Sequence, residues 1–346
     1  MDRTIYRFDQ LAMSSSSEGR APVAAGETGA AVTRPPRIGV IYNPRSHRNK
    51  GQDLDCAQRP EISVAQPQRR EDIATALSDF AAKGIDYLII NGGDGTVRDV
   101  LTMGQCVFGD TWPALAILPK GKTNALNVDL GAPSGWNLSD AIAAYGSGSR
   151  ITRRPLAVSR DGAHDPPMLG FIFGAGAFTL GIDAGQDAHE LGFFNSLAVG
   201  ATSAWGVLQA LFGGDGNKWR RGTRMALTDL PSGKAMPHSG HGDRERRSVI
   251  LASTLRRMPM GLKIFGKERD GLKLAVLDKP RRRVLASLPA ICMGWQPDWL
   301  EASGYHQISA ERFAMDIDEA VILDGEKFPP GRYIIGQGPE LTFVTP

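Results

Sequence analysis

Residues 86–96 read Asp-Tyr-Leu-Ile-Ile-Asn-Gly-Gly-Asp-Gly-Thr, and this stretch decides the fold. The apolar run 87–90 predicts a buried strand, and residues 97–104 after the turn predict a helix. Gly92, Gly93 and Gly95 let the backbone approach a phosphate closely, and the amides at a helix N-terminus point at its oxygens. Asp94 lies inside this turn, where a bare carboxylate would repel phosphate, so we expect it to serve a magnesium ion, a hydroxyl or an amide. The stretch therefore predicts a nucleotide site with chemistry beside it.

Strand and helix patterns alternate around this stretch, from residue 37 to residue 146. Short apolar runs predict strands, and apolar residues at helical spacing, such as Ile73 and Phe80, predict helices. Such alternation is typical of a parallel sheet with helices on both faces, where ligands bind at the carboxyl ends of the strands. Three strand ends, at Asn43, Gly92 and Gly121, are therefore expected to converge on one crevice. The predicted strands are residues 37–42, 61–66, 87–90 and 114–118, and the predicted helices are 70–83 ended by Gly84, 97–104, one closed by Gly131, and 137–145 ended by Gly146.

The pattern changes after residue 151. Apolar and polar residues alternate, and Asp-Gly pairs recur, which is typical of antiparallel strands joined by turns. The uncharged stretch 191–212 predicts one long helix, and a membrane span over residues 191–214 is the alternative. The predicted strands are residues 156–159, 169–173, 225–230, 249–254, 272–277 and 320–323, with two last strands near 333–335 and 341–344 that could return to pair with the first sheet.

These patterns predict a fold of the α/β plus all-β class. A doubly wound α/β domain over residues 37–150 is followed by an antiparallel, β-sandwich-like domain over residues 151–330, and residues 331–346 could return to the first domain. Residues 1–36 are rich in serine, alanine, glycine and proline, so they cannot bury enough surface to order themselves and are expected to form a disordered tail.

Composition excludes several classes of protein. The chain has 346 residues and a formal net charge of +3, which is too small to indicate a nucleic-acid partner. Its three cysteines, Cys56, Cys106 and Cys292, are odd in number and far apart, which argues against a disulfide framework and fits a reducing cytoplasm. Arginine clusters after residue 150 are expected either to be solvated or to face anionic lipid.

Three motifs together resemble one family. They are the loop 92–96, the loop 119–124 with the pattern Pro-x-Gly-x-x-Asn, and the triplet Asp324-Gly325-Glu326. In this order, and spread over an α/β half followed by a β half, they resemble the diacylglycerol kinase catalytic family, which includes bacterial lipid kinases, sphingosine kinases and ceramide kinases. The resemblance covers residues 37–346 and implies an NAD-kinase-like first domain and a lipid-substrate second domain.

The resemblance also implies roles for individual residues. Glu326 is expected to be the general base, with Asp324 beside it and Asp94 also in the catalytic set. Asp270, in an Asp-Gly-Leu turn, is expected to support magnesium. The residues expected to hold ATP are Asn43, Gly92, Gly93, Asp94, Gly95, Thr96, Gly121, Lys122, Thr123 and Asn124. ATP and Mg²⁺ are the implied cofactors.

The implied partner is a lipid substrate at a membrane surface, met by peripheral contact from the cytoplasmic side. Where the family has a threonine and an acid in the second loop, this sequence has Lys122 and Ala125. A lysine can still hold a phosphate as a point charge. Two alternatives stay open: a non-catalytic lipid- or nucleotide-binding protein with this fold, and an NAD or sugar kinase on a related scaffold. The sequence also leaves a homodimer as an option.

Overall fold

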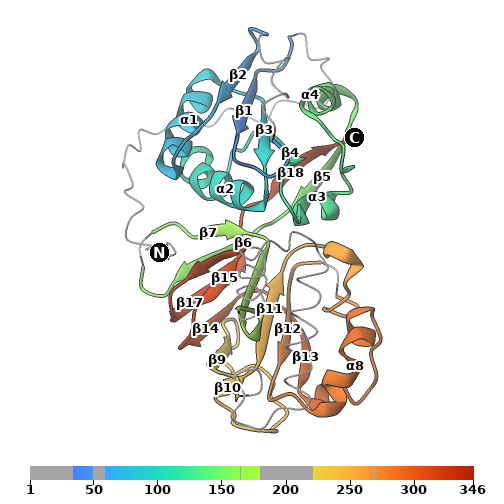
Figure 1. The fold of residues 1–346 in the computed structure, drawn as a ribbon. Coiled ribbons are helices and arrows are strands. Elements are labelled where there is room, and N and C mark those ends of the chain that lie inside the picture. The colour runs from blue at the N-terminus through green and yellow to red at the C-terminus, as the bar shows by residue number, and fades with distance from the viewer. Residues whose placement is uncertain (1–33, 50–58, 164, 180–220, 269) are drawn as a thin grey trace.

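The computed structural model describes residues 34–49, 59–163, 165–179, 221–268 and 270–346. Two lobes are stacked in it, an upper α/β lobe and a lower β lobe (Figure 1). Residues 1–33 of the predicted tail lie outside the described residues. Arg34 is placed, because its guanidinium pairs with Asp86 at 3.0 Å.

The upper lobe is built on one six-stranded sheet in the order β2-β1-β3-β4-β18-β5. Every neighbouring pair in it is parallel except β18 with β5. The carboxyl ends of β1, β3 and β4 therefore lie at one edge, as the alternating pattern predicts. The strands are β1 (Ile38–Tyr42), β2 (Ile62–Ala65), β3 (Tyr87–Gly92), β4 (Ala114–Pro119), β5 (Ser149–Arg153) and β18 (Leu341–Thr345).

Helices cover both faces of this sheet because its strands are apolar on both sides. Ile90 and Ile117 face the helices α1, α2 and α3, whereas Ile89 and Ala116 face α4. The helices are α1 (Arg70–Lys83), α2 (Asp94–Phe108), α3 (Ala125–Leu130) and α4 (Leu138–Ser147). The predicted bounds of α1 are confirmed, and Gly84 ends it in the left-handed conformation with φ 63°.

The lower lobe is a sandwich of two six-stranded antiparallel sheets, in the orders β10-β9-β14-β17-β6-β7 and β13-β12-β11-β8-β15-β16. Alternate side chains of both sheets, such as Phe313 and Tyr333 from one and Phe173 and Leu274 from the other, form a single core between them. The predicted α/β plus β-sandwich fold is thus confirmed. The strands are β6 (Leu156–Arg160), β7 (Met168–Gly170), β8 (Ile172–Gly176), β9 (Thr223–Asp229), β10 (Arg246–Arg247), β11 (Val249–Ser253), β12 (Leu272–Leu277), β13 (Tyr305–Ala310), β14 (Phe313–Ile317), β15 (Val321–Leu323), β16 (Glu326–Phe328) and β17 (Gly331–Gln337).

One helix, α8 (Arg282–Cys292), covers the outer face of the second sandwich sheet through Val284 and Ile291. Two short 3-10 turns, η3 (Pro259–Gly261) and η4 (Glu301–Ser303), flank this region. Among the described residues, no helix combines the length and the apolarity that a membrane span needs. The predicted helix 191–212, and the alternative span 191–214, lie outside the described residues.

Several predicted boundaries are wrong. The predicted strand 169–173 is two strands, β7 and β8, in different sheets. Phe171 lies between them, and its N–H donates to the Asp324 carboxylate instead of to the carbonyl of a neighbouring strand. Gly146 lies inside α4, which ends at Gly148. Of the two last strands, β18 joins the upper sheet, whereas β17 pairs with β6 and β14 in the sandwich. Tyr333 and Ile335 of β17 belong to the sandwich core, which explains that pairing.

Candidate active site

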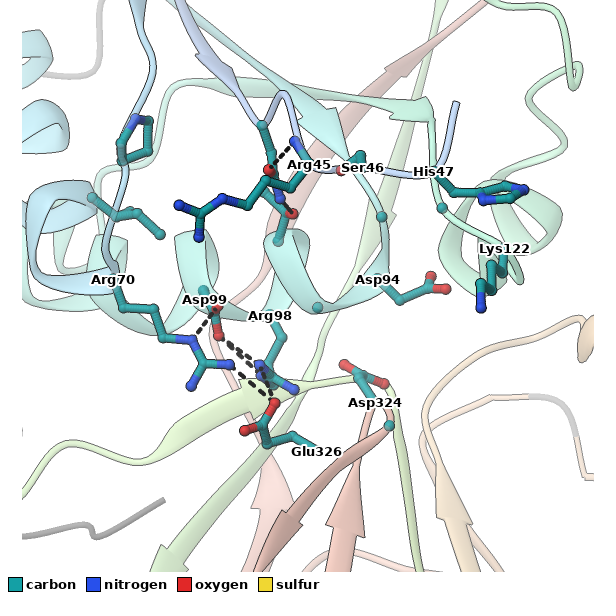
Figure 2. Close-up of a pocket in the computed structure, with 18 of the residues that line it drawn as sticks. Arg45, Ser46, His47, Arg70, Asp94, Arg98, Asp99, Lys122, Asp324 and Glu326 are labelled. Carbon is teal, nitrogen blue, oxygen red and sulfur yellow. Dashed lines mark hydrogen bonds and ion pairs between the residues drawn. The ribbon is translucent and has the colours of Figure 1, made fainter. Parts of the chain in front are cut away.

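A cavity of about 690 Å³ lies between the two lobes, at the carboxyl ends of the parallel strands. The upper lobe contributes the loops after β1, β3 and β4 and side chains of α1 and α2. Of the described residues of the lower lobe, those in the lining belong to the turn of the β15–β16 hairpin. Figure 2 shows Asp94 and Lys122 above Asp324 and Glu326 across this space. The motifs quoted from distant parts of the sequence therefore share one cavity. Its lining residues include Asn43, Gly93, Asp94, Gly95, Thr96, Gly121, Lys122, Thr123, Asp324 and Glu326.

The two glycine loops touch each other. A Cβ placed on Gly93 would lie 2.8 Å from the Cα of Gly121, so neither position has room for a side chain. Asn124, left-handed at φ 51°, closes the second loop, because its Oδ1 accepts from the Gly121 N–H at 2.7 Å and its Nδ2 donates to the Gly121 carbonyl at 2.9 Å. Gly95, by contrast, would meet nothing nearer than Arg98 Nη2 at 3.9 Å. The loops thus brace each other while Gly95 leaves open space for a ligand.

Substituting Gly93 tests this contact. Gly93 has φ −91° and ψ −177°, which alanine adopts readily, so the added methyl acts only through its collision with Gly121. We expect Gly93→Ala to destabilise the protein by about 1–3 kcal/mol, as overpacking does, and to weaken Mg-ATP binding. Gly146→Ala is the matched control, since nothing lies within 4 Å of its Cβ position and helical alanine is favoured over glycine by about 1 kcal/mol. Thermal unfolding and calorimetric titration measure both effects, and equal behaviour of the two variants would contradict the steric argument.

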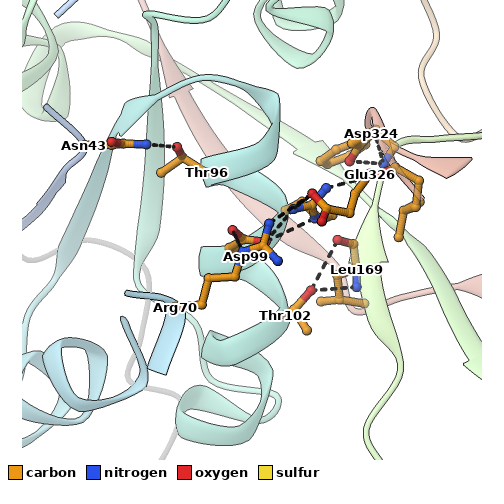
Figure 3. Close-up of polar contacts among 11 residues, drawn as sticks. Asn43, Arg70, Thr96, Asp99, Thr102, Leu169, Asp324 and Glu326 are labelled. Atoms are coloured by element: carbon orange, nitrogen blue, oxygen red, sulfur yellow. Dashed lines mark hydrogen bonds and ion pairs between the residues drawn. The ribbon is translucent and has the colours of Figure 1, made fainter. Parts of the chain in front are cut away.

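The first strand end is tied to the first glycine loop. Asn43 Nδ2 donates to Thr96 Oγ1 at 2.8 Å, and Asn43 Oδ1 accepts from the Arg45 N–H at 3.0 Å. Figure 3 shows the Asn43–Thr96 bond. Both residues line the cavity, as predicted from the strand end at Asn43. Gly92 is packed beneath this bond, because a Cβ there would lie 2.5 Å from the Cβ of Thr96, so it shapes the loop without lining the cavity.

Asp94 begins α2 but bonds to a different helix. Its Oδ1 accepts a hydrogen bond at 2.8 Å from the N–H of Ala125, the first residue of α3. Burial raises the pKa of Asp94, and the N–H groups of Ala125, Asn124 and Leu126 oppose that shift. The carboxylate therefore joins the two loops, which accounts for an acid in a turn that otherwise suits phosphate.

Asp324 occupies the tight turn of the hairpin, where Asp324 and Gly325 have φ 46° and 83°, as in a type I′ turn. Its carboxylate accepts from the N–H groups of Phe171 and Ile172 at 2.9–3.1 Å. Burial raises the pKa of Asp324 to about 7, and the negative charge of Asp94 adds to the shift, while the Ile172 N–H and Arg98 oppose it. Asp94 and Asp324 are thus close enough to repel each other across the cavity.

Glu326 lies in a network of four charged side chains (Figure 3). Its Oε2 is 3.0 Å from Arg70 Nη2 and 3.4 Å from Arg98 Nη2. Both arginines also pair with Asp99, each at 2.8 Å. Arg98 is only 2% exposed and its Nη1 donates to the Leu323 carbonyl at 3.3 Å. The network therefore joins α1 and α2 of the upper lobe to the hairpin of the lower lobe.

Sequence reasoning missed the basic lining of the cavity. Arg70 and Arg98, which pair with Glu326, and Asp99, which pairs with both arginines, were not among the predicted site residues. A signal was present at Arg98, which lies on the buried stripe of α2 between Val97 and Leu101. An arginine in such a stripe needs a buried partner. Arg45, His47 and Arg69 also line the cavity and were not predicted, whereas Lys122 was.

Three predicted site residues lie outside the cavity lining: Gly92, which is packed against Thr96, Asn124 and Asp270. Asn124 is buried beneath the second loop, where its side chain serves Gly121. Asp270 is 72% exposed and forms an ion pair with Arg256. It lies at the end of the connection between β11 and β12 and is not among the residues that line the cavity, so the structure does not support its predicted role at the carboxylates there.

Similarity to known proteins agrees with the geometry. The model of the diacylglycerol kinase catalytic domain matches residues 37–154, which contain both glycine loops. Probable lipid kinase YegS of Shigella flexneri is 33% identical over 91 residues, which are 26% of this chain and 30% of that protein. The protein of the same name from Escherichia coli O157:H7 matches to the same extent, so the matched segment spans 30% of these curated relatives.

Solved structures extend the likeness to both lobes. A diacylglycerol kinase from Bacillus anthracis str. Sterne superposes with a TM-score of 0.60 over 90% of this chain and 97% of that chain, at 14% identity. A second structure from the same organism gives a TM-score of 0.61 at 15% identity. At these identities the likeness shows the fold alone, an α/β lobe followed by a β-sandwich.

Proposed function

We propose that this protein is an ATP-dependent lipid kinase that transfers the γ-phosphate of ATP to a hydroxyl of a membrane lipid, such as diacylglycerol, a sphingoid base or ceramide. The observation that carries the proposal is the cavity itself. Two carboxylates from the distal hairpin, Asp324 and Glu326, line the same 690 Å³ space as both glycine loops of the kinase domain. A phosphate donor held by the loops and a hydroxyl beside the hairpin would meet there.

The upper rim suits a triphosphate. Gly95 leaves space at the N-terminus of α2, where backbone amides and the helix dipole favour an anion. Lys122 and Arg45 are exposed residues of the lining, positioned to neutralise phosphate charge. Phosphoryl transfer depends mainly on positioning and charge neutralisation, so these parts suffice without a covalent step through the protein.

The residues also fit a magnesium ion, although not at Asp270. Asp94 and Asp324 both have raised pKa values, chiefly through burial, and the charge of Asp94 contributes to the shift at Asp324. A divalent cation between them would relieve that repulsion. Magnesium is commonly bound by one or two carboxylates together with substrate phosphates. Such an ion would draw charge from the transferring phosphoryl group. Among the described residues, no cluster of three or more acidic, histidine or cysteine side chains forms a metal cage.

The hairpin would serve the acceptor. Glu326, fixed by Arg70 and Arg98, would accept the proton of the lipid hydroxyl, and Asp324 would orient the acceptor or hold the ion. The protein would work at the inner face of the cytoplasmic membrane, with the lower lobe presenting the lipid. No step in this scheme needs a cysteine, which agrees with the free thiols of Cys106 and Cys292 lying outside the cavity.

Radiolabelled ATP supplied with Mg²⁺ to the purified protein tests the proposal. We expect label to move to one of diacylglycerol, sphingosine or ceramide in detergent micelles, as read by thin-layer chromatography. Label on NAD instead would favour a soluble-substrate kinase. Absence of transfer to any acceptor, together with no heat in a Mg-ATP titration, would favour a non-catalytic protein.

The pH dependence of turnover tests the role of Asp324. Its pKa is raised to about 7, so the protonated, neutral form predominates below that pH. A neutral carboxyl can neither hold Mg²⁺ nor orient the acceptor as an anion. We therefore expect kcat/KM to rise about tenfold per pH unit below pH 7 and to level off above it. Asp324→Asn should lose most activity, and its remaining kcat/KM should no longer rise with pH below pH 7. An unchanged pH profile in that variant would exclude Asp324 as the cause of the rise.

A further inference from the structure

Four large apolar side chains stand out on the described surface. Val128 is 41% exposed, Met260 is 88%, Met293 is 65% and Trp295 is 49%. They come from three segments that are far apart in sequence: α3 of the upper lobe, η3, and the turn that follows α8. Single exposed apolar residues are ordinary, but their concentration on adjoining segments is a mark of an interaction surface.

Hydrogen bonds join these segments to one another. The Arg257 N–H donates to Asp129 Oδ1 at 2.7 Å, which fastens the start of the η3 loop to α3 beside Val128. The Lys263 N–H donates to the Cys292 carbonyl at 2.8 Å, which fastens the end of that loop beside Met293. The loop therefore bridges the two lobes and carries Met260 at its tip.

Met260, at the tip of the loop, has an unfavourable backbone conformation and an exposed side chain. Met260 has φ 59° and ψ 15°, a left-handed conformation that non-glycine residues seldom adopt, and its side chain is 88% exposed. An apolar side chain presented in this way is suited to a partner outside the chain.

Positive charge surrounds the apolar residues. Among the described residues between 256 and 270, the exposed basic side chains are Arg256, Arg257, Lys263 and Lys267 and the exposed acids are Glu268 and Asp270, of which Asp270 pairs with Arg256. Arg283, in the first turn of α8, lies 3.6 Å above the ring of Trp299, which in turn contacts Trp295 at 5.7 Å between ring centroids. Exposed methionine, tryptophan and basic side chains together match the interface of an anionic bilayer. Tryptophan is favoured there, and each nearby lysine or arginine strengthens binding about fivefold.

The surface also adjoins the cavity. Lys122 and Thr123 line the cavity, and α3 begins two residues later at Ala125. Figure 2 shows Lys122 at the cavity side from which α3 departs. A bilayer seated on Val128 and Met260 would therefore lie next to the rim through which a lipid hydroxyl could reach Asp324.

We propose that Val128, Met260, Met293 and Trp295, with Arg257 and Lys263 around them, form the face on which this protein docks to an anionic phospholipid bilayer. The role of this docking face rests on the proposed lipid kinase function. Docking would let the protein reach the hydroxyl of a lipid that stays partly in the membrane. Binding to the bilayer would insert the methionines and the tryptophan at the headgroup level and leave the basic side chains in the headgroup layer.

Vesicle co-sedimentation tests the docking face. Wild-type protein is expected to bind vesicles of phosphatidylglycerol and phosphatidylcholine, and to bind pure phosphatidylcholine vesicles far less. The double variant Met260→Asp/Met293→Asp should bind the anionic vesicles at least about tenfold more weakly, because it removes apolar burial and adds like charge. The matched control, Ala143→Asp/Ala235→Asp, changes the charge equally at exposed positions outside the three segments and should bind as the wild type does.

The outcomes separate docking from catalysis. Transfer of phosphate to a short-chain, water-soluble diacylglycerol should be equal in the wild type and the docking variant, because neither methionine lines the cavity. Equal vesicle binding by the docking variant and the wild type, or failure of the wild type to bind anionic vesicles, overturns the docking face. Vesicle binding without transfer to any lipid would leave the docking face standing and reject the kinase proposal.

Discussion

Glu326→Gln is expected to abolish nearly all phosphate transfer while leaving Mg-ATP binding close to that of the wild type. Removing a positioned proton acceptor costs about 10²–10⁴-fold in rate. The substitution preserves the shape of the side chain, and Arg98 keeps its bonds to Asp99 and to the Leu323 carbonyl. The nucleotide loops belong to the other lobe and do not contact Glu326 in the described contacts, so the donor site should persist. Turnover with labelled ATP and calorimetric titration of Mg-ATP measure the two effects.

Glu340→Gln is the matched control, because Glu340 is 61% exposed and its pairing with Arg154 is on the surface. It should retain full turnover. If Glu326→Gln turns over at the wild-type rate, the hairpin glutamate has no part in proton transfer. If it loses Mg-ATP binding as severely as turnover, Glu326 supports the donor site rather than the acceptor.

The sequence predicts the upper lobe well because its signals are local. The bounds of α1 follow from Ile73, Leu77 and Phe80 at helical spacing and from Gly84, which adopts the left-handed conformation at the end of the helix. The start of α2 was predicted too late, because Asp94 and Gly95 are weak helix formers that tertiary contacts hold in helical conformation.

The lower lobe was harder because its signals are not local. Residues 168–176 look like one apolar strand, yet the chain changes sheets at Phe171, whose N–H bonds to a carboxylate 153 residues away. The strands β13 and β14 and the helix α8 were not predicted. In α8, Pro289 interrupts the pattern, and the three arginines at its start suggest a solvated loop.

The same distinction holds for the site. The glycine loops and the Asp-Gly-Glu triplet are contiguous in sequence, so their residues could be named before the structure was known. Arg70 and Arg98 could not be assigned to them, because their partner Glu326 lies 256 and 228 residues away. Only the fold brings the two helices to the hairpin, and an arginine on a helix is otherwise most simply a surface charge.

Arg98→Met is expected to destabilise the protein by about 3 kcal/mol and to lower kcat while KM for Mg-ATP stays unchanged. Removing one partner of a buried ion pair costs about 3–5 kcal/mol. The lower end applies here, because Asp99 and Glu326 are 16% and 22% exposed and Arg70 still pairs with both. The fall in kcat follows because Glu326 loses one of the two guanidinium groups that orient it.

Arg224→Gln provides the matched control, since Arg224 is 61% exposed and pairs with Glu245 on the surface, where such pairs contribute about 0–1 kcal/mol. Arg98→Lys restores the charge but not the planar fork that reaches Asp99, Glu326 and the Leu323 carbonyl together, so it should regain part of the stability and little of the turnover. Thermal unfolding gives the first quantity, and steady-state kinetics well below the unfolding temperature give the second. A variant that loses stability yet keeps the wild-type kcat would reduce Arg98 to a structural residue, because a group that orients the proton acceptor cannot be removed without slowing the transfer.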